Sequence, residues 1–270
     1  MKILVLLGSP RKQDGYKVCK MLEEKVKSKG EVEFEFEYIN VSRLHIEECR
    51  GCELCLTKGE SYCPIKDDLA MLRQKMQEAD GIIFNSPVYA CHITGSLKKV
   101  VDRFGYLFHR PELIGKPALT VTTTAGGGIG PTSKYLKMLA VGFGCQWVGE
   151  IKVVASYLFE KRWGGQFFNA NYGLKIDGLL EQKAKRFYKA LTSEKLPKPS
   201  VYDVYVFYGL KSKTIASEAD YNYWKEKGWL KASYYYPTSL GPVQQLVKIA
   251  MELLLKALTP KKKNEDSSTV

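Results

Sequence analysis

The chain has 270 residues, 45% of them hydrophobic and 26% charged, and a formal net charge of +12. No stretch approaches the roughly eighteen apolar residues of a membrane span, and the N-terminal run lacks the small-residue cleavage site of a signal peptide. We therefore expect a cytoplasmic globular protein. The positive charge suits an anionic partner such as a phosphorylated cofactor. Because no nucleic-acid-binding module accompanies the charge, we expect no nucleic acid partner.

Strand and helix patterns alternate along residues 1–190. Residues 3–7 are continuously apolar, as in a central parallel strand, and residues 31–40 alternate apolar side chains with glutamate, as in an edge strand. Three more strands are expected at 81–85, 117–124 and 147–155, with helices around 18–26, 69–79, 97–104, 135–139 and 179–191. The alternation predicts a flavodoxin-like, doubly wound α/β fold with five parallel strands in the order 2-1-3-4-5.

Four cysteines lie close together in the segment CRGCELCLTKGESYCP, which replaces an ordinary loop after the second strand. They are Cys49, Cys52, Cys55 and Cys63. Compact runs of the form C-x2-C-x2-C with a fourth cysteine further on hold iron–sulfur clusters. Four thiolates also bind zinc, although zinc more often uses two separated CxxC pairs, and a reduced loop without metal is the third interpretation. The other cysteines, Cys19, Cys91 and Cys145, are expected to be small buried hydrophobic residues.

Three loops that follow predicted strands are candidate binding elements. Residues 8–12 (GSPRK) lead through 15–17 into the first helix, where backbone N–H groups and the helix dipole favour an anion such as phosphate. Residues 85–89 (NSPVY) follow the third strand, and residues 122–128 (TTTAGGG) follow the fourth. Glycine lets backbone approach a flat ring, while proline and tyrosine offer a stiff wall and an aromatic face. Because these loops flank the point where the strand order reverses, one ligand would extend across them.

Five motifs in this order resemble the NADPH-dependent FMN reductase superfamily, in particular its iron–sulfur flavoproteins. They are GSPRK (8–12), CxGCxxC…CPxxDD (49–68), SPVY (86–89), GSLKKVVDRF (95–104) and TAGG (124–127). The resemblance covers residues 1–190 and implies a flavodoxin-like fold with bound FMN. It also implies a [4Fe–4S] cluster on the four clustered cysteines. A homodimer or homotetramer is implied as well, in which the cluster of one subunit approaches the flavin of a neighbour.

The same resemblance carries the FMN site onto positions of this chain. It places the phosphate at Ser9, Arg11, Gly15, Tyr16 and Lys17. It places the flavin ring at Pro87, Val88, Tyr89, Ala90, Thr124, Ala125 and Gly126. The family often has Asn-Thr or Asn-Ser after the glycine of the first loop, whereas Tyr16 and Lys17 follow Gly15 here. The set of phosphate ligands therefore departs from the family pattern.

No acid–base pair or nucleophile stands out, and none is required, because a flavin performs hydride and single-electron chemistry itself. His92, beside the second loop, is a candidate for proton delivery. We expect an FMN-dependent oxidoreductase that transfers electrons between NAD(P)H or ferredoxin and an unidentified acceptor. The alternatives are a cluster-free NAD(P)H:quinone or flavin reductase, and a non-enzymatic electron carrier that serves a partner protein.

The C-terminal part differs in character from the rest of the chain. The proline-containing stretch 196–200 predicts a linker, which separates an FMN-binding domain (1–195, with the cysteine insertion at 47–66) from an extension (196–270). The extension is rich in aromatic residues, which could form a core, a lid over the flavin or a subunit-clasping arm, and we rank the oligomerisation arm first. Residues 241–258 predict an amphipathic helix whose alternative role is contact with a membrane surface, and residues 260–270 predict a disordered tail.

Overall fold

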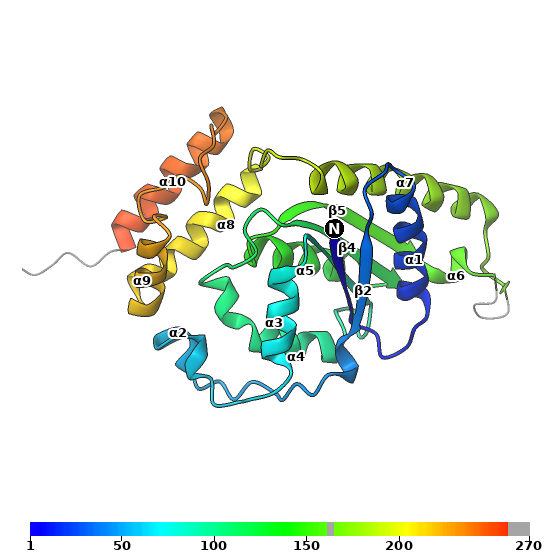
Figure 1. Ribbon diagram of the computed structural model, residues 1–270, viewed down its shortest axis with the longest axis horizontal. Coiled ribbons are helices and arrows are strands. Elements are labelled where there is room, and N and C mark those ends of the chain that lie inside the picture. Colours follow the sequence, from blue (N-terminus) through cyan, green and yellow to red (C-terminus); the bar gives the residue numbers. More distant parts are fainter. Residues whose placement is uncertain (161–164, 259–270) are drawn as a thin grey trace, which may run out of the picture. The chain divides into compact units, whose positions relative to one another are not determined.

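The computed structural model describes residues 1–160 and 165–258, which form two compact units (Figure 1). The first unit contains Met1–Cys55 and Gly59–Pro197, and the second contains Leu56–Lys58 and the chain from Lys198 onward. The linker predicted at 196–200 spans the point where the second unit begins. The predicted disordered tail lies outside the described residues.

The first unit is built on one parallel sheet in the order β2-β1-β3-β4-β5, which confirms the predicted flavodoxin-like fold. Its strands are β1 (Lys2–Leu7), β2 (Glu35–Asn40), β3 (Gly81–Pro87), β4 (Pro117–Thr124) and β5 (Gln146–Val154). All eight residues of β4 are buried, as a strand covered on both faces requires. Strand β2 pairs only with β1 and is therefore an edge strand, but it begins four residues later than the alternating pattern predicts.

Helices cover both faces of the sheet (Figure 1). Helices α1 (Asp14–Lys27) and α7 (Ala170–Leu191) pack together on one face, where their apolar side chains form a core with those of β1, β4 and β5. The opposite face is covered by α3 (Leu69–Glu78), α4 (Gly95–Arg103) and α5 (Ile129–Gly142). Short elements complete the unit: η1 (Val41–Arg43), η2 (Glu60–Tyr62), η3 (Gly105–Phe108) and α6 (Ala155–Leu158). The division between the units falls within the short helix α2 (Leu54–Thr57).

The second unit is helical, with α8 (Val201–Lys211), η5 (Ser212–Ile215), α9 (Glu218–Glu226) and α10 (Pro242–Leu258). Helix α8 begins with a capping box, in which Ser200 and Asp203 each bond the other's backbone N–H. The aromatic residues that distinguish this part of the sequence mostly form the core of the unit. Those buried are Phe207, Tyr208, Trp224, Trp229, Tyr234 and Tyr235, whose rings contact one another mostly edge-on or tilted.

Helix α10 packs against α8 but has no buried residue of its own. A stripe of apolar side chains along it is half or more exposed: Val243, Leu246, Ile249, Leu253, Leu254 and Leu258. Elsewhere in the extension, Tyr205 and Tyr221 are also exposed, at 55% and 44%. Within the described residues, no helix is both long and apolar enough to cross a membrane.

Candidate functional site

A shallow pocket of about 70 Å³ lies where β1, β3 and β4 end at the carboxyl edge of the sheet. Three loops that are far apart in sequence contribute to its wall. The lining residues are Ser9, Arg11, Gln13, Asp14, Gly15, Pro87, Val88, Tyr89, Thr123, Thr124 and Ala125. The pocket therefore lies at the switch point of the strand order, where doubly wound proteins bind their ligands.

The first loop turns tightly from β1 into α1. The N–H of Gly8 donates to the carbonyl of Asn85 (2.8 Å), and the hydroxyl of Thr94 donates to the carbonyl of Gly8 (2.6 Å). Gly15, in the first turn of α1, lies directly on the buried side chain of Asn85, with no room for a β-carbon between them. These contacts hold the N-terminus of α1, with the backbone N–H groups of its first turn, at the pocket.

The second loop contains a strained turn. Tyr89 and His92 exchange two backbone hydrogen bonds (2.9 and 3.0 Å), and the two residues between them, Ala90 and Cys91, both have positive φ angles of 47° and 62°. Such φ angles in a two-residue hairpin are those of a type I′ turn, which prefers Asn-Gly. The turn presents the ring of Tyr89, which is 39% exposed, at the rim of the pocket.

The third loop is shaped by hydrogen bonds from Thr124. Its hydroxyl donates to the carbonyl of Gly127 (2.8 Å) and accepts the N–H of Gly126 (3.1 Å). Gly128 has a positive φ of 77°, and a β-carbon there would lie 2.7 Å from Val88 Cγ1 and 2.8 Å from Cys91 Cα. Gly128 therefore lets this loop pack against the second loop, so that the two walls of the pocket support each other.

The pocket brings together most, but not all, of the residues carried over by resemblance. Ser9, Arg11, Gly15, Pro87, Val88, Tyr89, Thr124 and Ala125 line it, whereas Tyr16, Lys17, Ala90 and Gly126 do not. The ring of Tyr16 packs edge-on against Tyr38, and the ammonium of Lys17 lies 5.1 Å from the ring centre of Phe159. Sequence reasoning missed Gln13, Asp14 and Thr123, although an acidic residue opening a helix is a recognisable start signal.

The residues at the pocket suit a flavin nucleotide. A helix N-terminus, the hydroxyl of Ser9 and the exposed guanidinium of Arg11 are donors for a phosphate. Pro87, Val88 and Tyr89 form an apolar wall for a planar ring. Asp14 is the one acidic side chain among the lining residues.

His92 and Cys91 lie close to the pocket without lining it. The imidazole of His92 packs edge-on against Tyr135, with 4.5 Å between ring centres. Cys91 is exposed at the strained turn, so the prediction that it is a small buried residue was wrong, whereas Cys19 and Cys145 are buried as predicted. The thiol of Cys91 is exposed because the turn projects its two central residues away from the sheet.

The four clustered cysteines lie on one loop of the first unit, outside the pocket. Cys49 and Cys52 are exposed on irregular chain, while Cys55 in α2 and Cys63 after η2 are partly buried. Burial, and then negative charge at Cys63, Cys49 and Cys52, raises the pKa of the Cys55 thiol. Across residues 1–160 and 165–258, no three His, Cys, Asp or Glu side chains lie close enough together to hold a metal ion. The donor set itself, four thiols on one short loop, suits a cluster or zinc.

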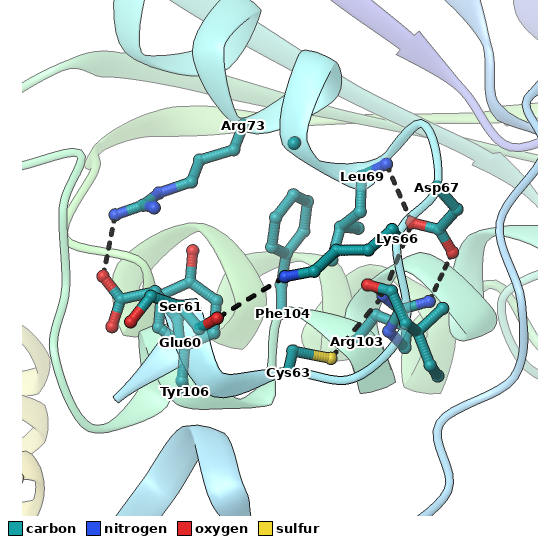
Figure 2. Close-up of a pocket in the computed structure, with 12 residues that line it drawn as sticks. Glu60, Ser61, Cys63, Lys66, Asp67, Leu69, Arg73, Arg103, Phe104 and Tyr106 are labelled. Carbon is teal, nitrogen blue, oxygen red and sulfur yellow. Dashed lines mark hydrogen bonds and ion pairs between the residues drawn. The ribbon is translucent and has the colours of Figure 1, made fainter. Parts of the chain in front are cut away.

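A buried ion pair closes the base of this loop (Figure 2). The Arg103 guanidinium, from α4, pairs with the Asp67 carboxylate, and the two side chains are 2% and 1% exposed. Burial by itself raises the pKa of Asp67, but hydrogen bonds from Arg103 and from the N–H groups of Glu47 and Leu69 outweigh it, so the pKa lies below its usual range. Asp67 also accepts the N–H of Leu69 (3.1 Å), the first residue of α3. No pattern in the sequence predicts that Asp67 pairs with Arg103.

A pocket of about 410 Å³ adjoins Cys63 above this ion pair (Figure 2). Phe104, Tyr106 and Leu69 supply apolar surface, and Lys66 extends across it toward the carbonyl of Ser61 (3.5 Å). Arg73 lies at the other end and is bound to Glu60 (3.0 Å) and Glu112 (2.5 Å). The sequence patterns do not predict the charged side chains around Cys63, although Arg103 and Asp67 both lie within the motifs of the family resemblance.

The fold is that of a flavodoxin-like protein, with a pocket at the switch point of its sheet. Residues 1–159 match the family model described as NADPH-dependent FMN reductase. The chain belongs to this family and is a flavin-dependent oxidoreductase, as the sequence predicts.

Relatives with the name iron–sulfur flavoprotein were also found. One from Archaeoglobus fulgidus is 30% identical over 246 residues, covering 85% of this chain and 100% of the relative. One from Methanosarcina thermophila is 33% identical over 128 residues, covering 47% of this chain and 64% of the relative. These likenesses confirm the resemblance that the motifs indicate.

Solved structures share the fold at low sequence identity. A flavone reductase superposes with a TM-score of 0.53 at 21% identity, over 74% of this chain and 66% of that structure. The apo form of an NADH:FMN oxidoreductase superposes with a TM-score of 0.50 at 20% identity, over 72% of this chain and 91% of that structure. At this identity, the likeness establishes the fold alone.

Proposed function

We propose that the protein binds FMN across the three loops and uses it to transfer electrons from NAD(P)H or ferredoxin to an acceptor. The observation that carries the proposal is the convergence of Ser9, Arg11 and Gly15 with the wall formed by Pro87 and Tyr89 in one pocket. This pocket lies within the part of the chain that matches the FMN reductase family.

Each loop has its own task in the proposed site. Ser9 and Arg11 bind the FMN phosphate together with backbone N–H groups at the start of α1, to which Gly15 and Tyr16 belong. Lys17 adds positive charge from the next position of the helix. The side chains and backbone of 87–90 and 124–126 lie along the ring, and they orient it and exclude water from one of its faces. A bound FMN supplies the hydride and single-electron chemistry, so no acid, base or nucleophile of the chain is required.

The four clustered cysteines, Cys49, Cys52, Cys55 and Cys63, hold a [4Fe–4S] cluster in this proposal. Support comes from their compact spacing and from the relatives named iron–sulfur flavoproteins. A cluster of this kind exchanges single electrons, which suits ferredoxin as a partner. Zinc on the same thiolates is the alternative occupant.

The extension contributes to self-association in this proposal. Its exposed positions on α10 include Val243, Leu246, Ala250, Leu253 and Ala257, which alternate by three and four residues. This spacing forms a coiled-coil seam that a second copy of the same helix complements. In a homodimer or homotetramer, another subunit would cover this apolar stripe. The alternative is that the stripe contacts a membrane surface, in which case it is covered only when lipid is present.

An anaerobic purification with flavin, iron and acid-labile sulfide quantified tests the proposed function. If the four cysteines hold one [4Fe–4S] cluster, we expect about one FMN and four iron atoms per chain. Bleaching of the flavin absorbance by NADPH supports the NAD(P)H-dependent reductase, and bleaching by reduced ferredoxin alone supports the carrier or a ferredoxin-linked enzyme. Flavin without iron or sulfide would reject the cluster, and failure to bind FMN would reject the whole proposal.

The exposure of Cys49 and Cys52 favours a second candidate, a cluster-free NAD(P)H:quinone or flavin reductase. This enzyme would use the same FMN pocket and leave the cysteine loop reduced. It would contain FMN, lack iron and sulfide in the same measurement, and turn over quinones with NADPH.

A further inference from the structure

Arg103 contacts the cysteine loop on both sides of the four cysteines. Its Nη1 donates to the carbonyl of Glu47 (3.1 Å), before the first cysteine. Its Nη2 lies 3.4 Å from the carbonyl of Ile65, after the last cysteine, and 3.8 Å from the Sγ of Cys63. A planar guanidinium has enough fixed donors to make these contacts at the same time.

Two aspartates bind the entry of the loop to its exit. Asp67, paired with Arg103, also accepts the N–H of Glu47 (2.9 Å). Asp68 accepts the N–H of His45 (2.8 Å) and donates its own N–H to the carbonyl of His45 (3.1 Å). The ends of the cysteine loop are thus closed by a hydrogen-bonded clasp, centred on a charge pair that water barely reaches.

The neighbouring arginines make a different kind of contact. Arg110 donates to the carbonyl of Cys55 and lies 3.6 Å from Glu60, and Arg73 binds Glu60 and Glu112. Arg103, by contrast, reaches a cysteine sulfur. A donor to a ligating sulfur stabilises the more negative, reduced state of an iron–sulfur cluster and raises its potential.

We propose that Arg103 is a positioning residue for the cluster, which closes the cysteine loop and donates a charge-assisted hydrogen bond to the Cys63 thiolate. The inference rests on the proposed cluster. Arg103 is far in sequence from the cysteine ligands. In this inference it slows the loss of iron from the cluster and raises the redox potential of the cluster. Because Asp67 neutralises the guanidinium and holds its plane, the hydrogen bond to sulfur is fixed before the cluster binds.

The test compares two arginine variants of the full-length protein purified anaerobically. Arg103→Gln removes the buried guanidinium. Arg50→Gln removes the same charge from the cysteine loop itself, at a side chain that is 61% exposed. For each protein, FMN, iron and sulfide are quantified, the rate of iron loss to a chelator is measured, and the cluster is titrated potentiometrically by electron paramagnetic resonance.

Arg103→Gln is expected to keep FMN but to lose iron to the chelator about tenfold faster. At a fixed potential, its ratio of reduced to oxidised cluster falls about tenfold, which is about 59 mV for a one-electron couple. Arg50→Gln changes the ratio less than about twofold, because its charge is screened by solvent.

The remaining outcomes are equally decisive. Equal effects of the two variants on potential and iron loss would overturn the inference and leave the proposed cluster intact. A wild-type protein with FMN but without iron and sulfide would overturn the cluster and the inference together. If Arg103→Gln does not accumulate in folded form, Arg103→Lys replaces it, because it keeps the charge but has a single nitrogen in place of the two that contact the loop. Wild-type iron retention and potential in Arg103→Lys would then overturn the inference.

Discussion

The α-carbon of Gly15 lies so close to the side-chain amide of Asn85 that an added β-carbon would be 2.6 Å from its Oδ1 and 2.7 Å from its Nδ2. Asn85 cannot easily move, because it is fully buried and donates to the carbonyl of Val121 (3.2 Å). The first turn of α1 and the end of β3 are therefore in direct contact at the base of the pocket. This contact sets where the helix N-terminus meets a ligand.

Substitution of Gly15 by alanine is expected to push α1 away from the pocket. Overpacking of this kind costs about 1–3 kcal/mol of unfolding free energy, and we expect FMN affinity to fall about tenfold, or about 1.4 kcal/mol. Urea unfolding and flavin fluorescence titration measure the two effects. Gly95→Ala is the matched control, because a β-carbon there meets open space. Equal effects of both variants would contradict the packing argument.

Arg11→Gln tests the assignment of the phosphate to the first loop. Loss of a charge-assisted contact is expected to weaken FMN binding about tenfold and riboflavin binding less than about twofold. Dissociation constants of the apoprotein for both flavins measure the difference. Arg43→Gln, at an exposed arginine in η1, makes the same change of net charge and should leave the ratio unchanged. Equal weakening of both flavins by Arg11→Gln would place the phosphate elsewhere.

Asp67→Asn tests the charge pair with Arg103 through its pH dependence. The lowered pKa of Asp67 means that its stabilisation is present above the ordinary value of about 3.9 and is lost as the pH falls below it. At pH 7, removal of one partner of a buried pair is expected to cost about 3 kcal/mol. The difference in unfolding free energy between wild type and variant should therefore shrink below about pH 4. A difference that is constant with pH would show that Asp67 does not act through its charge.

The strained turn at Ala90 and Cys91 offers a stabilising substitution. Two L-residues with positive φ cost about 1 kcal/mol or more each, whereas Asn-Gly favours this turn. The double variant Ala90→Asn, Cys91→Gly is expected to gain about 1 kcal/mol, a rise of roughly 2–4 °C in Tm. Cys91→Ser, which keeps the strain, should give no gain. A lower Tm for the double variant would mean that the side chains at 90 and 91 make stabilising contacts.

The stripe on α10 is tested by its effect on the oligomeric state. Leu246→Lys combined with Leu253→Lys places two charges in the proposed seam and is expected to convert the oligomer to a smaller species. Light scattering coupled to gel filtration measures the mass. Gln245→Lys adds charge at an exposed polar position of the same helix and should leave the mass unchanged. An unchanged mass in the double lysine variant would place self-association on another surface.

Much of the first unit is predictable from local patterns. Strand β4 runs from Pro117 to Thr124, as predicted, because a continuous apolar and β-branched run between helices has few other solutions. Strand β2 is shorter than its alternating pattern, because its register against β1 begins at the pair Lys2 and Glu35. Phe34, just before the strand, is buried instead in the core that the sheet forms with helices α1 and α7. Alternation thus predicts the strand but not where pairing starts.

The second unit shows the opposite case. Its aromatic density indicated that these side chains must be covered, and we expected a neighbouring subunit to cover them. The chain covers Phe207, Trp224 and Tyr235 by folding back on itself. Aromatic composition alone cannot distinguish an internal core from an interface, because both bury the same rings.

The amino-acid sequence by itself determined the parallel fold, the three loops at its carboxyl edge and the compact run of Cys49, Cys52, Cys55 and Cys63, because these depend on periodicity and short spacing. Only the tertiary structure decided that Gly15 rests on Asn85 and that Arg103 closes the cysteine loop with Asp67. These contacts join residues tens of positions apart, and no local pattern specifies which buried partner a guanidinium or a glycine will meet. The cysteines were recognisable from their spacing, whereas the groups that hold their loop became visible only when the chain was folded.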